Sequence, residues 1–194
     1  MYTFQSDWFT PQIPLWEKYL AEYKGKENLS FIEIGSFEGR SAVWLLENIL
    51  TGSCAQLTCI DTFGGSIENQ TKSEIDLSQI EQNFDHNIKE AGFSKKVKKM
   101  KLPSANAFQQ LPFNSFDVIY IDGSHTAPDV LSDAVMYFHL LKSGGTMIFD
   151  DYEWEEIGIR ELDKPKLAID AFLAINKEKI EILFKGIQVI IRKR

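Results

Sequence analysis

Cysteine and basic charge are scarce in this chain, and each scarcity excludes a kind of protein. Among 194 residues there are two cysteines, Cys54 and Cys59, and their spacing is not that of a Cys-x-x-Cys pair. A disulfide framework and a zinc site are therefore not expected. Cys59 lies within an apolar run that reads as a buried strand, so we interpret it as a reduced core thiol in a cytoplasmic protein.

The charge balance argues against nucleic acid as a partner. The chain has 21 basic and 28 acidic residues and a net charge of −7, whereas phosphate binding needs a basic surface. Its one basic cluster, residues 95–101, is interrupted by apolar residues, and a strand with one solvated face explains it better than a binding patch.

Long apolar runs are also absent. No segment approaches the roughly 20 apolar residues of a membrane span, and the N-terminus has no basic region followed by an apolar run. We therefore expect no signal peptide and no membrane partner.

The chain is long enough for one domain with a substantial core. We expect residues 1–30 to form a helical cap segment, with a helix from Trp8 to Lys24, and residues 31–194 to form the main domain. Strand and helix patterns alternate through the main domain, which predicts a mostly parallel sheet with helices on both faces. The predicted strands are 31–34, 56–61, 97–102, 116–122 and 146–150, and the predicted helices are 41–50, 77–91, 105 onward, 127–141 and 166–176. Residues 142–145, Lys-Ser-Gly-Gly, read as the C-cap of the 127–141 helix.

The C-terminal part of the pattern differs. Two apolar runs, 179–184 and 187–191, are separated only by Lys185 and Gly186. So short a connection joins antiparallel strands only. The sequence thus predicts a seven-stranded sheet that ends in an antiparallel hairpin.

A glycine-containing loop follows the first predicted strand. Residues 31–41 read Phe-Ile-Glu-Ile-Gly-Ser-Phe-Glu-Gly-Arg-Ser, which places Gly35 and Gly39 in a Glu-x-Gly-x-x-x-Gly pattern. This is not the Gly-x-Gly-x-x-Gly spacing of dinucleotide folds. Asp61 follows Gly35 by 26 positions, where a carboxylate can accept both hydroxyls of a ribose. A turn-forming aspartate before residues 62–65 is the alternative.

Acidic residues also end later strands. Asp122 ends the fourth predicted strand and Asp150 and Asp151 end the fifth, so the three carboxylates are expected to converge and to suit a hard cation such as Mg²⁺. The alternative is a turn at Asp122 and a solvated loop at the other two. His125, three residues after Asp122, fits a general base and a helix-entry hydrogen bond equally well.

These residues carry a resemblance to a known family. The segments 117–125 (Asp-Val-Ile-Tyr-Ile-Asp-Gly-Ser-His) and 140–152 (Leu-Leu-Lys-Ser-Gly-Gly-Thr-Met-Ile-Phe-Asp-Asp-Tyr) resemble class I S-adenosylmethionine-dependent O-methyltransferases, especially the metal-dependent catechol, caffeoyl-CoA and macrolide-sugar enzymes. The resemblance implies a Rossmann-like fold with a terminal hairpin, and S-adenosylmethionine is also the ligand that the glycine loop suggests. The resemblance implies metal ligands at Asp122, Asp150 and Asp151, a ribose contact at Asp61 and adenine contacts at Ser104 and Ala105. From the glycine loop and the strand ends themselves we expect further cofactor contacts at Glu33, Gly35, Ser36, Phe37, Gly39, Ser41, Thr62 and Asp122, and catalytic roles for His125 and Asp122.

Two positions depart from the family pattern. His125 stands where the catechol-type enzymes place a catalytic lysine, and Pro103 stands where an acid often precedes Ser104. The Asn-Pro-Pro-Tyr signature of many amino-methylating enzymes is absent, which favours oxygen as the methyl acceptor.

The sequence therefore predicts metal-assisted methylation of a hydroxyl on a small molecule. The alternatives are a nicotinamide-dependent oxidoreductase on a related fold and a non-catalytic cofactor-binding homologue. Substrate is expected to enter over residues 8–16, 64–76 and 152–164, where aromatic residues form either a lid or ordinary core: Trp8, Phe9, Trp16, Tyr152 and Trp154. The aromatic N-terminal segment could equally serve a homo-oligomer interface.

Overall fold

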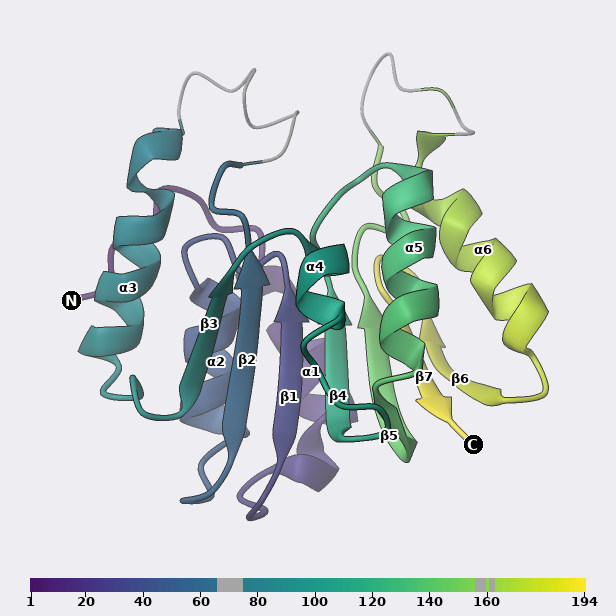
Figure 1. Cartoon of the computed structure of the whole chain (residues 1–194), viewed down its shortest axis with the longest axis horizontal. Helices are drawn as coiled ribbons and strands as arrows, with labels where there is room; N and C mark the ends of the chain where they lie inside the picture. The colour runs from purple at the N-terminus through teal and green to yellow at the C-terminus, as the bar shows by residue number, and fades with distance from the viewer. Residues whose placement is uncertain (66–74, 156–159, 161–162) are drawn as a thin grey trace.

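In the computed structural model, seven strands form one sheet in the order β3-β2-β1-β4-β5-β7-β6 (Figure 1). The structure describes residues 1–65, 75–155, 160 and 163–194. The strands are β1 (Ser30–Ile34), β2 (Gln56–Asp61), β3 (Val97–Lys101), β4 (Phe116–Ile121), β5 (Leu141–Phe149), β6 (Ile180–Lys185) and β7 (Val189–Lys193). The α-helices are α1 (Ile13–Tyr19), α2 (Arg40–Asn48), α3 (Ile80–Glu90), α4 (Ser104–Phe108), α5 (Ala127–Phe138) and α6 (Pro165–Asn176). Short 3₁₀ helices are η1 (Thr10–Gln12), η2 (Ala21–Tyr23) and η4 (Leu77–Gln79).

The pairing confirms the predicted mixed sheet. β1 pairs in parallel with β2 and β4, β2 with β3, and β4 with β5. β7 is antiparallel to both β5 and β6, so the C-terminal hairpin joins the sheet through its second strand. The five parallel strands therefore place their carboxyl ends along one edge of the sheet.

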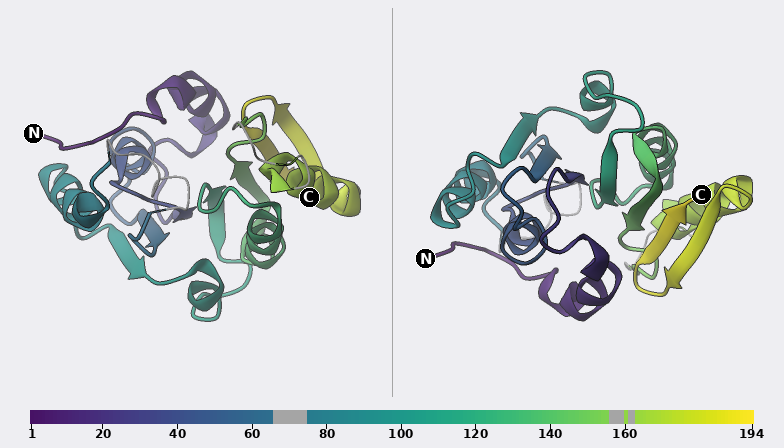
Figure 2. Two further views of the ribbon diagram at one scale, coloured as in Figure 1. Left: turned by 90° about the horizontal axis from the view of Figure 1, so that it is seen from above. Right: turned by 90° about the horizontal axis from the view of Figure 1, so that it is seen from below.

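Helices cover both faces of the sheet. Successive side chains of a strand point to opposite faces, so neighbouring residues pack against different groups of helices. Phe31 packs in the core cluster that contains the buried residues of α1, α2 and α3, whereas Ile32 packs with those of α4, α5 and α6. Figure 2 shows these two groups of helices on opposite sides of the sheet. β1, β2 and β4 are buried on both faces, as their continuous apolar runs predicted.

The basic run that includes β3 forms the predicted strand with a solvated face. β3 is an edge strand, and Lys99 lies 2.9 Å from Glu81 and 2.7 Å from Asp85 on α3. Lys99 and Lys101 therefore form ion pairs with the neighbouring helix. None of the described helices has the length and apolar character needed to cross a bilayer.

The prediction of one helix from Trp8 to Lys24 was wrong. The segment consists of η1, α1 and η2 in succession, with Pro11 and Pro14 at the starts of the first two. Proline suits the first turn of a helix but cannot continue one, and Leu20 leaves helical geometry between α1 and η2 (φ −103°, ψ 1°). Trp16 and Leu20 are nevertheless fully buried, so the segment packs as part of the core beside α2.

The predicted boundary between the fifth helix and the fifth strand was also wrong. α5 ends at Phe138, and residues 142–145 belong to β5 instead of capping the helix. Lys193 caps this end of α5, since its Nζ donates to the carbonyl oxygens of Phe138 and Leu141 (2.8 and 2.6 Å). The buried pair Leu140–Leu141 looks like a continuation of the apolar helix face, although it forms the turn and the start of the strand.

Candidate functional site

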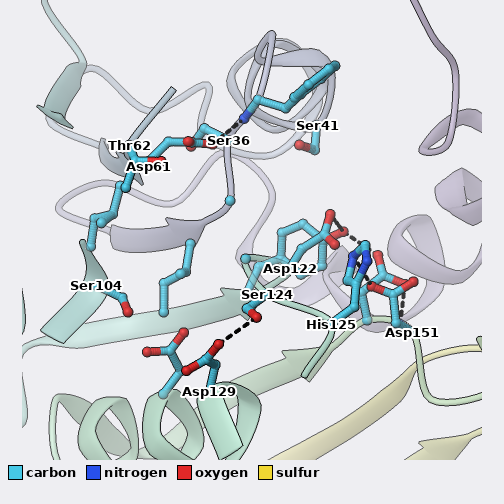
Figure 3. Close-up of a pocket in the computed structure, with 18 of the residues that line it drawn as sticks. Ser36, Ser41, Asp61, Thr62, Ser104, Asp122, Ser124, His125, Asp129 and Asp151 are labelled. Carbon is cyan, nitrogen blue, oxygen red and sulfur yellow. Dashed lines mark hydrogen bonds and ion pairs between the residues drawn. The ribbon is translucent and has the colours of Figure 1, made fainter. Parts of the chain in front are cut away.

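A cavity of about 700 Å³ opens at the carboxyl ends of the parallel strands. Figure 3 shows its lining, with Ser36, Asp61 and Thr62 on one side and Asp122, His125 and Asp151 on another. Of the predicted cofactor contacts, these line it: Gly35, Ser36, Phe37, Ser41, Asp61, Thr62, Ser104, Ala105 and Asp122. The predicted metal ligands Asp150 and Asp151 line it as well, as does His125. Glu33 and Gly39 are not among the lining residues.

Gly35 permits β1 and β4 to end in contact. Its backbone is in the left-handed region (φ +86°), and a Cβ built there would lie 1.8 Å from the carbonyl oxygen of Asp122. Only glycine fits both conditions. Gly39 has φ +79° and precedes α2, with the ring of Phe84 3.0 Å from its Cβ position. The two glycines thus shape the loop that forms one wall of the cavity.

Glu33 supports this loop from behind. Its side chain is fully buried on the α2 side of the sheet, where it accepts hydrogen bonds from the Ser41 hydroxyl (2.5 Å) and the Cys59 thiol (3.7 Å). Burial raises the pKa of Glu33 to about 7, although both donors act in the opposite direction. The direct cofactor contact expected of Glu33 remains a prediction, since this geometry assigns the carboxyl to the strand–helix junction.

Asp61 joins the glycine loop to the end of β2. Its two carboxylate oxygens accept the backbone N–H groups of Phe37 (2.7 Å) and Phe63 (2.6 Å). Desolvation raises the pKa of Asp61, while these backbone donors favour its charged form. A carboxylate oxygen has two acceptor positions, so Asp61 retains capacity for a ribose hydroxyl at the cavity surface.

The opposite part of the cavity holds an acidic cluster around a histidine. Ligand atoms of Asp122, His125 and Asp151 lie within 4.8 Å of one another, and His125 Nε2 is 2.9 Å from Asp151 Oδ2. The Asp122 pKa lies well above its usual range, first because of desolvation and then because of the charges of Asp150 and Asp151. Asp151 has positive φ (+59°), a backbone conformation that is uncommon for residues other than glycine. A cation would offset the repulsion among these carboxylates.

Asp150 lies behind this cluster in a network of hydrogen bonds. It accepts from the Tyr120 hydroxyl, from Gln188 Nε2 (3.0 Å) and from the backbone N–H of Asp151 (2.8 Å). Gln188 in turn accepts from Trp16 Nε1 (2.9 Å). Burial raises the pKa of Asp150 to about 6. Its expected role as a metal ligand remains a prediction, because protein donors already contact both of its oxygens.

The Tyr120 hydroxyl connects the two strand ends. It contacts Asp122 Oδ2 (2.8 Å) as well as Asp150, and burial followed by these two negative charges raises its pKa well above the usual value. Tyr120 precedes Asp122 by two residues and therefore lies on the same side of β4. That spacing was available in the sequence, but the role of Tyr120 was missed.

A third part of the lining surrounds Ser104 and Ala105, at the start of α4. The Ser104 carbonyl accepts from the Tyr137 hydroxyl (2.8 Å), and the Ser104 side chain interacts with the carboxylate of Asp133 on α5. Nearby, the hydroxyls of Ser124 and Thr126 both donate to Asp129 Oδ2 at 2.8 Å. Neither Asp129 nor Asp133 was identified from the sequence, because both occupy polar positions in an ordinary amphipathic helix pattern.

The expected aromatic lid separates into two groups. Trp8, Phe9 and Trp154 line the cavity, and the Trp154 ring lies 5.1 Å from the His125 ring. Trp16 is fully buried in the core, and Tyr152 is buried with its hydroxyl 3.0 Å from Asp170. The proposed substrate-entry segments 64–76 and 152–164 lie partly outside the described residues.

The N-terminal segment covers the glycine-loop side of the cavity. Gln5 donates to the buried Glu38 carboxylate through its backbone N–H (2.7 Å) and through Nε2 (2.8 Å). Arg40 donates to the Ser6 carbonyl (3.0 Å) and stacks on the Phe4 ring at 4.1 Å. Phe4, Ser6 and Trp8 consequently form part of the cavity wall.

This combination of fold and site defines a class of protein: the sheet order, the terminal hairpin and a glycine-loop cavity at the strand ends are those of a class I methyltransferase. A family model described as a methyltransferase domain matches residues 32–152, and the chain belongs to that family. The match confirms the resemblance to the class I S-adenosylmethionine-dependent methyltransferase family.

One relative by sequence is an uncharacterised protein of Acanthamoeba polyphaga mimivirus, which is 30% identical over 136 residues. The match covers 69% of this chain and 56% of the viral protein, so the chain spans only about half the length of this relative.

Solved structures share the fold at low sequence identity. An O-methyltransferase from Bacillus cereus in complex with SAH superposes with a TM-score of 0.67 at 16% identity, covering 98% of this chain and 84% of that one. The O-methyltransferase TomG from Streptomyces achromogenes, involved in tomaymycin synthesis and bound to SAM, gives 0.66 at 14% identity, covering 94% and 79%. A candidate rRNA methylase from Clostridium thermocellum gives 0.66 at 12%, covering 94% and 95%.

Proposed function

We propose that this methyltransferase transfers the methyl group of S-adenosylmethionine to a hydroxyl on a small molecule, with assistance from a divalent cation. The observation that carries the proposal is a single cavity with the glycine loop and Asp61 in one part and Asp122, His125 and Asp151 in another. The proposal thus joins a nucleoside site to a site suited to proton removal.

The glycine-loop side suits the cofactor. The left-handed glycines let the backbone approach a ligand closely, and the first N–H groups of α2 can bind a carboxylate. Asp61 lies beside them with acceptor capacity for ribose hydroxyls. The SAH and SAM complexes of the Bacillus and Streptomyces structures support this assignment.

The donor set of the acidic cluster fits a divalent cation. Asp122, Asp151 and His125 would hold it, and a bound cation lowers the pKa of a substrate hydroxyl. Two carboxylates and an imidazole suit Mn²⁺ at least as well as Mg²⁺, because Mg²⁺ prefers oxygen ligands and the imidazole offers a nitrogen. We retain Mg²⁺ as the first candidate and compare the two metals directly in the experiment below.

The chain's own residues can also manage the proton. In the absence of a cation, His125 would instead accept it from the substrate hydroxyl, and Asp151, 2.9 Å from His125 Nε2, would stabilise the resulting imidazolium. Tyr120 and Gln188 would keep Asp150 and the strand ends in place. Trp154 and Trp8 would bind the apolar part of the substrate and position its oxygen for in-line attack on the methyl group.

A small molecule is favoured over RNA as the acceptor. The net charge is −7, and Arg40 is the only lysine or arginine among the described lining residues of the cavity. A polyanion would be repelled by this surface. The nicotinamide alternative lacks support, because the loop spacing is not that of a dinucleotide fold.

The decisive experiment is calorimetric titration with S-adenosylmethionine and S-adenosylhomocysteine, without metal and with Mg²⁺ or Mn²⁺. It is followed by transfer of labelled methyl groups to a panel of hydroxylated compounds and to RNA. Micromolar cofactor binding and metal-dependent methylation of a hydroxyl are expected, and Asp151→Asn should lower turnover more than cofactor affinity.

Three results would contradict parts of the proposal. Failure to bind either cofactor would reject it entirely, particularly if NADH raised the melting temperature instead. Full turnover in EDTA would reject the cation while retaining His125 as the base. Methylation of RNA alone would reject the small-molecule acceptor.

A further inference from the structure

Asp133 is a buried carboxylate in the wall of the cavity, and the proposed mechanism does not use it. The residue is 5% exposed, lines the cavity from α5, and lies beside Ser104. Its Oδ2 is 3.8 Å from the Cβ position of Gly123, which places it next to the end of β4. Burial raises the pKa of Asp133 to about 6, so placing a charge here has a cost that a ligand donor would offset.

The position of Asp133 relative to Asp61 suggests which part of a ligand it meets. Asp61 ends β2, Ser104 follows β3, and Gly123 follows β4, so Asp133 lies between Ser104 and the end of β4, in the part of the cavity wall that follows Asp61 toward α4. Leu102 and Ile60 line the same region and supply apolar surface for a flat ring. A nucleoside whose ribose is held by Asp61 would direct the edge of its base toward Ser104 and Asp133.

A carboxylate at the base edge distinguishes purines by their hydrogen-bonding groups. Adenine carries an amino group at position 6, which donates, whereas hypoxanthine carries an oxygen there, which only accepts. A charged acceptor facing that position binds the first and repels the second. Pro103, which precedes Ser104, has no side-chain acceptor to perform this role from the adjoining loop.

We propose that Asp133 accepts a hydrogen bond from the 6-amino group of the cofactor's adenine and makes the site selective for adenosyl over inosyl ligands. This inference rests on the proposed cofactor. It assigns to α5 a contact with the base, whereas the family resemblance implied cofactor contacts at Ser104 and Ala105.

The test compares the dissociation constants of S-adenosylhomocysteine and S-inosylhomocysteine, which differ in the group at position 6 and in the protonation of the adjacent ring nitrogen. The unmodified protein is expected to prefer the adenosyl ligand by about 10- to 100-fold, the range for a hydrogen bond to a charged group. Asp133→Asn keeps the size of the side chain and adds an N–H₂ donor that suits the oxygen of hypoxanthine. The preference should fall by about tenfold or more in this variant, chiefly through tighter binding of the inosyl ligand.

A matched control is Asp129→Asn, one turn earlier on α5. Its carboxylate also lines the cavity but accepts from Ser124 and Thr126, so the ratio of the two dissociation constants should stay as in the unmodified protein. If Asp133 has a purely structural role, Asp133→Asn would weaken the binding of both ligands equally and leave that ratio unchanged. This result would overturn the inference, although the proposal that the protein binds the cofactor would still hold. If neither ligand binds the unmodified protein, the proposed function itself fails.

Discussion

At the scale of single residues, Gly35 carries the tightest steric requirement of the site. Gly35→Ala would place a methyl group 1.8 Å from the Asp122 carbonyl at a positive φ. Gly92→Ala is the control, since Gly92 also has positive φ (+79°) but no atom within 4 Å of its Cβ position. We expect the control to lose about 1 kcal/mol of unfolding free energy, and Gly35→Ala to lose about 3 kcal/mol or more together with cofactor binding. Urea unfolding and calorimetry measure both effects, and equal losses in the two variants would contradict the clash.

Glu33 should make the stability of the protein depend on pH. Its pKa rises from 4.5 to about 7 in the folded state, so the folded protein binds more protons than the unfolded chain between these values. The unfolding free energy should therefore fall as pH rises through this window, with Glu33 contributing on the order of 3 kcal/mol.

Glu33→Gln keeps the size of the side chain and its acceptor for Ser41 but does not titrate. Urea unfolding gives the unfolding free energy at pH 5 and at pH 8. The difference between these two values should be smaller in the variant than in the unmodified protein, because the other buried acids are present in both proteins. An unchanged difference would show that Glu33 ionises in the folded state as easily as in water.

At the scale of elements, the N-terminal segment is attached to the glycine loop mainly through Gln5. Gln5→Ala removes the side-chain bonds to Glu38 (2.8 Å) and to the backbone N–H of Asp76 (2.7 Å). Because Glu38 is only 1% exposed, we expect a loss of about 1 kcal/mol in unfolding free energy and several-fold weaker binding of S-adenosylhomocysteine.

Thr3→Ala provides the comparison, since Thr3 contacts Asn87 through its backbone N–H and carbonyl (2.7 and 2.8 Å) and keeps both in the variant. Cofactor affinity should not change in it. Equal affinities in Gln5→Ala and Thr3→Ala would show that the N-terminal segment does not contribute to the cofactor site.

Much of the element order was predictable because apolar periodicity and short connections leave few arrangements. The acids at the strand ends followed from the same reasoning, since parallel strands end at one edge of the sheet. Asp133 was not predictable, because a polar residue between Val130 and Ala134 reads as the solvated face of a helix. Gln188 was missed within an apolar hairpin, and the Leu140–Leu141 turn was read as helix. In each case a tertiary contact gave the residue its role, and no local pattern records such a contact.

At the scale of the whole molecule, Trp16 and Gln188 connect the first helix to the last hairpin across 172 positions. Trp16→Phe would leave the buried amide oxygen of Gln188 without its indole donor, which costs about 1–3 kcal/mol. Trp44→Phe is the control, since Trp44 packs 5.9 Å from Trp16 in the same aromatic cluster. Urea unfolding should show the larger loss for Trp16→Phe, and equal losses would mean that ring packing alone matters.

The hydrogen bond from Gln188 to Asp150 also has a consequence for biosynthesis. Gln188 follows Asp150 by 38 positions, and β7 pairs directly with β5. A ribosome delivers the glycine loop and every acid of the cluster well before it delivers the strand that holds Asp150 in place. During synthesis, Asp150 therefore completes its set of hydrogen bonds only after the C-terminal hairpin has left the exit tunnel.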